Sequence, residues 1–148
     1  MARPRGGDWL EDEIRSLKDS KVDLVVSLLT KPEIVELDLL EEELLCRSNQ
    51  IGFMNFPIID RDVPALDRKT YSLVKELSDN LSRGQSIAIH CRMGIGRSSL
   101  IAASVLAIQG ISVNEAFKCI ETSRGCSVPD TVEQRDWVGK FATRFIGE

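Results

Sequence analysis

The stretch "SIAIHCRMGIGRSSLIAASVLAI", residues 86–108, joins an apolar run, a His–Cys pair, a glycine-rich turn and a long apolar segment. The apolar run over 85–91 predicts a short strand, and the segment after the turn predicts a helix ended by Gly110. His90 is the only histidine of the chain, and Cys91 follows it at the end of the expected strand. The stretch therefore predicts a strand–loop–helix junction with reactive side chains at its turn.

Apolar periodicity and cap signals place the other elements. Apolar runs predict strands over 22–30 and 51–58. Helical spacing predicts helices over 8–19, 67–83, 112–124 and 130–145, and a helical segment over 33–49 that is either continuous or broken into two. Capping boxes are expected at Asp8 with Glu11, Ser112 with Glu115, and Asp130 with Glu133.

Strands that alternate with helices are typical of an α/β fold. We expect a single domain over residues 1–148, with a central, mostly parallel sheet of about four to five strands flanked by helices. Ligands of such sheets bind beyond the carboxyl ends of the strands. The sequence places Cys91 at such an end, and Asp60 at another.

Composition narrows the class of protein. The 148 residues carry a net charge of −4, which does not favour a nucleic-acid partner. No apolar run is long enough for a membrane span, and no signal peptide or lipidation motif is recognisable, so we expect a cytoplasmic chain. The four cysteines are irregularly spaced and one histidine completes no usual zinc ligand set, so free thiols are expected.

The turn between Cys91 and Arg97 has the features of a phosphate-binding loop between a strand and a helix. Gly94 and Gly96 allow consecutive N–H groups to turn inward on an anion, and the helix N-terminus favours the same anion. Arg97 adds a planar fork that matches two phosphate oxygens, and the positive field lowers the pKa of Cys91. Each feature alone also fits a plain strand-to-helix turn. Together they favour a thiolate that attacks phosphorus; a Walker A loop is excluded because no GK[ST] occurs.

Three segments carry a family resemblance. "HCRMGIGRS" resembles the His-Cys-x5-Arg-Ser/Thr loop of the cysteine-dependent protein tyrosine phosphatase superfamily. "FPIIDRDVP" resembles the general-acid segment of its compact dual-specificity and cell-cycle-phosphatase-like branches. "SRGCSVPDTVEQRDWV" is similar to their Arg-Gly…Pro-Glu-Thr…Gln stretch, with Asp130 where the pattern has Glu.

The resemblance implies a role for each matching residue. Cys91 is the expected nucleophile, Arg97 holds the transferring phosphoryl group, and Ser98 donates to the Cys91 sulfur as it leaves. Asp60 is the expected general acid, with Asp62 as its local rival. No metal and no cofactor are implied.

Further residues surround these. The loop that binds the phosphate of the substrate is expected to comprise Arg92, Met93, Gly94, Ile95 and Gly96. Arg124 either binds a substrate phosphate as well or caps the helix that ends at Gly125. His90 is expected to position the loop from behind, and the resemblance places Gln134 beside the hydrolytic water. Trp9 and Trp137 are expected in the core.

The predicted function is that of a phosphoprotein phosphatase, acting on phosphotyrosine, phosphoserine or phosphothreonine through a cysteinyl-phosphate. A phosphorylated protein or peptide is the expected partner, and a monomer is the expected state. Two alternatives stay open: a phosphatase of a phosphoinositide or an RNA 5′ end, and a non-catalytic phospho-binding module. Cys126, and less readily Cys46, are candidates for a protective disulfide with Cys91.

Overall fold

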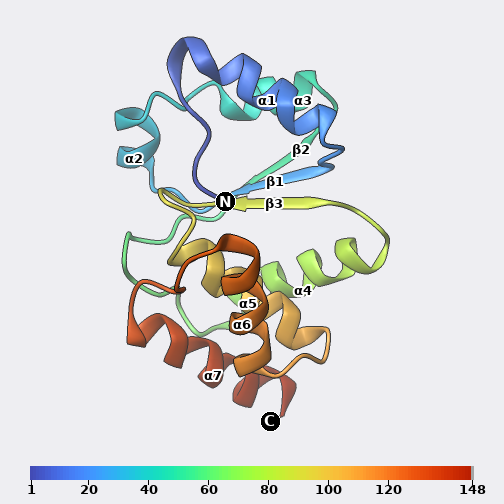
Figure 1. Cartoon of the computed structure of the whole chain (residues 1–148), viewed down its shortest axis with the longest axis vertical. Helices are drawn as coiled ribbons and strands as arrows, with labels where there is room; N and C mark the ends of the chain where they lie inside the picture. The colour runs from blue at the N-terminus through green and yellow to red at the C-terminus, as the bar shows by residue number, and fades with distance from the viewer. Residues whose placement is uncertain (148) are drawn as a thin grey trace.

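A three-stranded sheet lies at the centre of the computed structural model, which describes residues 1–147; the last residue of the expected domain, 148, lies outside them (Figure 1). The strands are β1 (Leu24–Ser27), β2 (Gly52–Asn55) and β3 (Ile87–His90), in the order β2-β1-β3. Both pairings are parallel, with Leu24 opposite Gly52 on one side and Ile87 on the other. The parallel α/β prediction is confirmed, and each strand falls inside a predicted apolar run.

The number of strands is lower than expected, since residues 1–147 form three rather than four or five. The three apolar runs of the sequence account for all of them. At the outer edge of β3, the backbone nitrogens of Met1 and Arg3 donate to the carbonyls of Ile89 and Arg92. These isolated bonds cover the edge of the sheet without building a ladder, so the first residues add no strand.

Helices cover both faces of the sheet, as Figure 1 shows. Above it lie a short 3-10 helix η1 (Gly7–Trp9), α1 (Leu10–Asp19), α2 (Lys31–Glu36) and α3 (Glu42–Ser48). Below it lie α4 (Arg68–Ser82), α5 (Arg97–Ile108), α6 (Val113–Arg124) and α7 (Val132–Ile146). The helical segment over 33–49 is thus broken into two, the second of the readings that the sequence left open.

The helix starts follow the predicted capping chemistry in part. Half of the box expected at Ser112 forms: its hydroxyl accepts from the Glu115 N–H, but the Glu115 side chain does not return a bond to the Ser112 N–H. No box forms at Asp8, because the 3-10 helix η1 precedes α1 there. The box expected at Asp130 and Glu133 is also wrong by one position: Thr131 caps α7 and Gln134 completes the box. The Thr131 hydroxyl accepts from the Gln134 N–H, and the Gln134 amide oxygen accepts from the Thr131 N–H, so the box has the expected chemistry one residue later.

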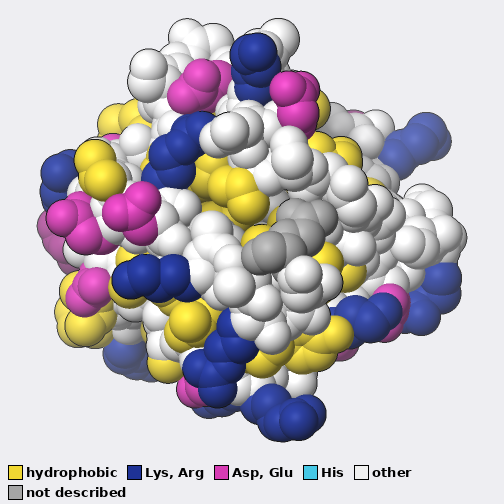
Figure 2. Space-filling view, turned by 90° about the horizontal axis from the view of Figure 1, so that it is seen from below, with side chains coloured by type: hydrophobic (Ala, Val, Ile, Leu, Met, Phe, Trp, Pro, Cys, Tyr) yellow, Lys and Arg dark blue, Asp and Glu magenta, His cyan; other side chains and the backbone are white. Residues whose placement is uncertain are grey.

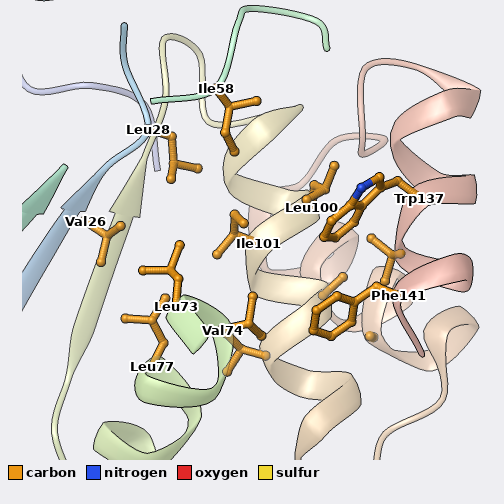
Figure 3. Packing of buried hydrophobic residues seen from close by; sticks show 14 of the residues in the cluster. Val26, Leu28, Ile58, Leu73, Val74, Leu77, Leu100, Ile101, Trp137 and Phe141 are labelled. Carbon is orange, nitrogen blue, oxygen red and sulfur yellow. The ribbon is translucent and has the colours of Figure 1, made fainter. Parts of the chain in front are cut away.

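Strand β1 divides the core into two layers because its side chains alternate between the faces of the sheet. Val25 packs with Leu10 and Ile14 under the upper helices. Val26 packs against the lower helices, with side chains from α4, α5 and α7 (Figure 3). Burial on both faces explains why β1 reads as a continuous apolar run.

The two tryptophans differ in burial. Trp137 lies in the lower core, as predicted, and stacks on Phe141 at 5.3 Å between ring centroids. The prediction is wrong for Trp9, which is 57% exposed. Trp9 lies in η1 rather than on the inner face of α1, and the Arg5 guanidinium covers its ring at 4.5 Å. A cation–π contact of this kind stabilises an aromatic ring at the surface.

The surface around α7 and the C-terminus has no concentrated basic region. Figure 2 shows Lys and Arg side chains scattered over this face, with neutral, hydrophobic and acidic side chains between them. Among residues 1–147, no helix has the length and apolarity needed to cross a membrane.

Candidate active site

The loop 91–96 leaves the carboxyl end of β3 and enters α5 at Arg97. Glycine is needed at positions 94 and 96 of the loop for different physical reasons. Gly94 has φ +74°, a left-handed conformation that favours glycine. At Gly96, an added Cβ would lie 2.6 Å from the Asp130 carboxylate and 2.9 Å from Gln134 Oε1. The expected need for a backbone conformation that favours glycine is confirmed at Gly94 and wrong at Gly96, where φ is −90° and close packing against the start of α7 is what excludes a side chain.

Cys91 is buried at the start of this loop, with its Sγ 3.4 Å from Ser98 Oγ. Burial alone would raise the pKa of this thiol. Hydrogen bonds from the Ser98 hydroxyl and from the backbone N–H groups of Ser98 and Gly94, together with the charge of Arg97, outweigh burial and hold the pKa below its ordinary value. The structure therefore brings together the predicted nucleophile and the predicted hydroxyl donor, and favours a thiolate.

Arg97 is the most constrained charged side chain of the site, with 1% of its side chain exposed. Nη1 donates to Glu33 Oε1 at 2.7 Å and to the Ile58 carbonyl at 2.8 Å, and Nη2 donates to Glu33 Oε2 at 2.9 Å. Asp60 Oδ1 lies 3.1 Å from Nη2. Nε is buried and has no hydrogen-bond partner among the residues described. The guanidinium is thus fixed through its outer nitrogens, with one inner donor left over.

Glu33 was missed by the sequence analysis. It lies at the third position of α2, where its carboxylate also accepts from the Thr30 N–H at 3.1 Å. Burial acts to raise the pKa of Glu33, but hydrogen bonds from Arg97 and Thr30 lower it to about 2. The signal was present, since Thr30 and Glu33 form a Thr-x-x-Glu capping box. What no local pattern could reveal was the second use of that carboxylate, 64 residues from Arg97.

The structure separates the two candidate acids. The expected place of Asp60 at a strand end is wrong: β2 ends at Asn55, and Asp60 lies in the loop that follows, where it reaches Arg97 while its side chain stays half-exposed. Asp62 Oδ1 accepts from the Val63 N–H at 2.7 Å, and its carbonyl accepts from Gln134 Nε2 at 3.1 Å. Asp62 therefore shapes the loop, and only Asp60 of the two forms an ion pair with Arg97.

Gln134 is fully buried, although a glutamine at this position of a helix could equally have been exposed. Its Oε1 accepts from the N–H groups of Asp130 and Thr131, and its Nε2 donates to the carbonyl of Asp62. Gln134 thus ties the start of α7 to the loop of the candidate acids. The Gln134 side chain also packs against Gly96, and so against the phosphate-binding loop.

Arg124 contacts the loop rather than capping its own helix. Its Nε donates to the Gly94 carbonyl at 3.1 Å and Nη2 to the Met93 carbonyl at 3.3 Å. Holding these carbonyls outward leaves the N–H side of the loop free for an anion.

The remaining loop side chains differ in exposure. Arg92 forms an ion pair with Glu36 at 3.0 Å, Met93 is exposed, and Ile95 packs partly into the lower core.

His90 lies behind the loop, as expected. Its ring is buried, with Nε2 2.6 Å from Glu42 Oε2 and Nδ1 3.4 Å from the Cys91 carbonyl. Glu42 is the second residue that the sequence analysis missed. Nothing in the segment 33–49, which the sequence marks only as helical, indicates a buried carboxylate.

All four cysteines are free. Cys46 is buried, and burial together with the charge of Glu42 raises the pKa of its thiol to about 12, so it is a poor nucleophile. Cys126 and Cys119 are exposed. A cluster of three or more His, Cys, Asp or Glu side chains that could hold a metal ion is not found among residues 1–147.

Comparison with known families gives a match over most of the chain. The family model described as "Dual specificity phosphatase, catalytic domain" matches residues 13–137. That span contains Cys91, Arg97, Asp60 and Ser98.

Two curated proteins are similar in sequence. "Cyclin-dependent kinase inhibitor 3" of Rattus norvegicus is 26% identical over 136 residues, which cover 89% of this chain and 63% of that protein. "Putative tyrosine phosphatase 067L" of Invertebrate iridescent virus 3 is 30% identical over 141 residues, which cover 83% of this chain and 58% of that protein. The chain therefore spans less than two thirds of the length of either relative.

A solved structure has the same fold. A kinase associated phosphatase, with a serine in place of its catalytic-site cysteine, superposes with a TM-score of 0.88 at 21% identity. The match covers 99% of this chain and 86% of that one. At this identity the likeness shows the arrangement of helices and strands.

Proposed function

The chain belongs to the dual specificity phosphatase catalytic-domain family, and from that premise we propose that it hydrolyses phosphate monoesters of protein side chains through a cysteinyl-phosphate. The proposed substrates are phosphotyrosine, phosphoserine and phosphothreonine in a phosphorylated protein or peptide. The proposed nucleophile is Cys91, the proposed phosphoryl clamp is Arg97 with the loop N–H groups, and the proposed general acid is Asp60.

The observation that carries this proposal is the buried guanidinium of Arg97. Its outer nitrogens are held by Glu33, Asp60 and the Ile58 carbonyl, while Nε has no partner in the part of the chain that the structure describes. A buried N–H of a charged group is costly to leave unpaired. A tetrahedral dianion bound against the loop would supply an acceptor for Nε, because phosphate oxygens accept strong, charge-assisted hydrogen bonds from a guanidinium.

The proposed hydrolysis has two steps, formation of the cysteinyl-phosphate and its hydrolysis. The Cys91 thiolate attacks phosphorus, the S–P bond forms, the P–O bond to the side chain breaks, and Asp60 gives its proton to the leaving oxygen. Asp60 then takes a proton from water, the water oxygen bonds to phosphorus, and the S–P bond breaks. The Ser98 hydroxyl, 3.4 Å from the sulfur, donates a hydrogen bond to the departing thiolate. Arg97 and the loop N–H groups stabilise the equatorial oxygens in both transition states.

Loop charge supports a protein substrate over a phosphoinositide. Apart from Arg97, the only basic side chain of the loop is Arg92, which is paired with Glu36. The exposed loop side chain is Met93, which offers apolar contact to a peptide. A multiply phosphorylated headgroup would instead need further free cations. We also propose that the chain acts as a cytoplasmic monomer, in keeping with its net charge of −4 and the absence of a membrane-crossing helix among residues 1–147.

The test is hydrolysis of phosphotyrosine, phosphothreonine and phosphoserine peptides, with a phosphoinositide and a 5′-triphosphate RNA as competitors, in EDTA. We expect turnover of a peptide, inhibition by vanadate, and phosphopeptide binding without turnover in Cys91→Ser. Residual turnover in Cys91→Ser would rule out the covalent route. Peptide binding without any turnover by the unmodified chain would favour the binding module, and preferential turnover of the lipid or RNA would favour the other phosphatases.

A further inference from the structure

A buried, hydrogen-bonded histidine and carboxylate lie directly behind the predicted nucleophile. His90 Nε2 and Glu42 Oε2 are 2.6 Å apart, and the two side chains are 0% and 3% exposed. Glu42 lies in the first turn of α3 in the upper layer, and His90 is the last residue of β3. The pair therefore connects a helix above the sheet to the residue that precedes Cys91.

The second ring nitrogen also faces an acceptor. His90 Nδ1 lies 3.4 Å from the carbonyl oxygen of Cys91. A carbonyl accepts hydrogen bonds and cannot donate, and an ionised carboxylate is likewise an acceptor only. A neutral imidazole has a single N–H group. If Glu42 is ionised, a neutral ring could donate to only one of the two oxygens and would turn a lone pair toward the other. A ring with two N–H groups donates to both the Glu42 carboxylate and the Cys91 carbonyl.

Other charges lie near the ring: the Met1 ammonium donates to the carbonyl of Ile89, the residue before His90, and the Arg97 guanidinium acts on the Cys91 thiol. On β1, Ser27 is opposite His90 in the register, and its hydroxyl accepts from the Leu29 N–H. On α3, Cys46 is a neutral thiol because its pKa is about 12. The charged neighbours of Glu42 on α3 are Glu43 and Arg47, which form an exposed pair of their own. Among residues 1–147 the Glu42 carboxylate is hydrogen-bonded to His90 Nε2 alone, so the ring is the group that balances its charge.

We propose that Glu42 is a positioning residue for Cys91: it holds His90 as an imidazolium whose Nδ1–H donates to the Cys91 carbonyl and whose positive charge lies beside the thiolate. This rests on the proposed function, because it assigns Glu42 a role in preparing the nucleophile. Glu42 does not touch the substrate. It acts through His90 by orienting the Cys91 peptide and by adding a positive charge next to the sulfur.

The wild-type chain allows a direct test. Because His90 is the only histidine, ¹⁵N-histidine labelling gives one pair of ring nitrogens. At pH 7 we expect both to carry a bonded proton, seen as two one-bond N–H couplings in the folded protein. A nitrogen without a proton would place the shared proton on Glu42 and would overturn the proposal. This measurement does not involve catalysis, so its failure is distinct from a failure of the proposed phosphatase activity.

A matched pair of variants tests the consequence for Cys91. Glu42→Gln keeps the shape of the side chain, and its amide can donate to Nε2 of a neutral His90 that still donates from Nδ1. The hydrogen bonds survive and only the charge is lost. Glu43→Gln is the control, since it is the same change at the next position of α3, in the exposed pair with Arg47.

The readout is the pH dependence of Cys91 alkylation by iodoacetate, with thermal unfolding as a check of folding. In Glu42→Gln we expect the midpoint to move up by about 0.5 to 1 pH unit, which lowers the rate about three- to tenfold below both midpoints. Glu43→Gln should keep the wild-type midpoint. An unchanged midpoint in Glu42→Gln, or an equal shift in both variants, would overturn the proposal. Should Glu42→Gln fail to fold, the ¹⁵N measurement on the wild type decides alone.

Discussion

Arg97 and Glu33 form a two-point ion pair inside the protein, with Nη1–Oε1 at 2.7 Å and Nη2–Oε2 at 2.9 Å. The pair joins α2 to the first residue of α5. A guanidinium held at two points cannot rotate about its own axis, so the direction of its unpaired Nε is set before any anion arrives. Preorganised donors of this kind contribute most to catalysis, because nothing has to reorient during the reaction.

Glu33→Gln should destabilise the fold and change how its stability depends on pH. The pKa of Glu33 is about 2 in the folded protein, against 4.5 for the free side chain. The unfolded chain therefore binds more protons than the folded one between these values, and the stabilisation from Glu33, fully present above pH 4.5, is lost as pH falls toward 2. Removing one partner of a buried pair costs about 3–5 kcal/mol.

The measurement is chemical denaturation from pH 2 to 7 for the wild type and Glu33→Gln. The difference in unfolding free energy between the wild type and Glu33→Gln should be largest above pH 4.5 and should decrease toward pH 2. Glu43→Gln, in an exposed pair, should follow the wild type. A difference that stays constant across this range would show that the loss comes from packing and not from the ionised pair.

Arg97→Lys should disable the site even though the charge is kept. An ammonium lacks the planar fork, so it cannot hold Glu33 and the Ile58 carbonyl while donating toward the phosphate. We expect kcat/KM for an aryl phosphate to fall at least about 10²–10³-fold. The matched control is Arg83→Lys, at the exposed end of α4, which should leave kcat/KM within about twofold. A nearly active Arg97→Lys would show that the planar guanidinium is not needed to hold Glu33 and donate toward the phosphate at once.

Local patterns predicted the elements and the loop, because their signals are carried within a few residues. The Cys91–Arg97 turn is set by its two glycines and by the apolar segments on either side. The same reasoning failed where a contact joins distant residues. Glu33 and Glu42 lie 64 and 48 residues from Arg97 and His90, and no spacing in the sequence connects them.

The smaller errors have similar causes. Asp130 fits a capping box as well as Thr131 does, and only the packing of Gln134 against Asp62 and Gly96 decides between them. Trp9 is expected in the core, but its place in η1 turns it toward Arg5. Competition between two locally acceptable arrangements is settled by tertiary contacts, which a single sequence does not display.

Ser98→Ala should raise the pKa of Cys91. Burial already acts to raise it, and the Ser98 hydroxyl is the main group that opposes burial. Without that hydroxyl the thiolate forms at higher pH, so the acid limb of the pH profile of kcat/KM should move up by about one unit. Departure of the thiolate in the second step should slow as well, so a burst of phenol release should precede the steady state.

The control for Ser98→Ala is Ser104→Ala on the same helix, whose buried hydroxyl donates to the Leu100 carbonyl at 2.8 Å. Stopped-flow measurement of phenol release, together with the pH profile, checks both expectations. The Ser104 variant should lose only stability. An acid limb that stays in place in Ser98→Ala would show that the backbone N–H groups and Arg97 suffice to lower the pKa of Cys91.

Asp60→Asn and Asp62→Asn should separate the general acid from its rival. Asp60 lies 3.1 Å from Arg97 Nη2, beside the guanidinium that would hold the phosphoryl group, whereas the Asp62 carboxylate is used by the Val63 N–H. A general acid matters most when the leaving oxygen is strongly basic, as a threonine alkoxide is, and contributes about 10²–10⁴-fold. Asp60→Asn should therefore slow hydrolysis of a phosphothreonine peptide by that factor.

The diagnostic quantity is the ratio of two rates, the phosphothreonine peptide against an aryl phosphate whose phenol is strongly acidic. Asp60→Asn should lower this ratio by about tenfold or more, because the acidic phenol leaves without a proton. Asp62→Asn should lower both rates alike if it loosens the loop, and so should leave the ratio unchanged. The reverse pattern would assign the acid to Asp62. Unchanged ratios in both variants would mean that a side chain outside the 58–64 loop protonates the leaving group, because loss of a proton donor must weigh more heavily on the more basic oxygen.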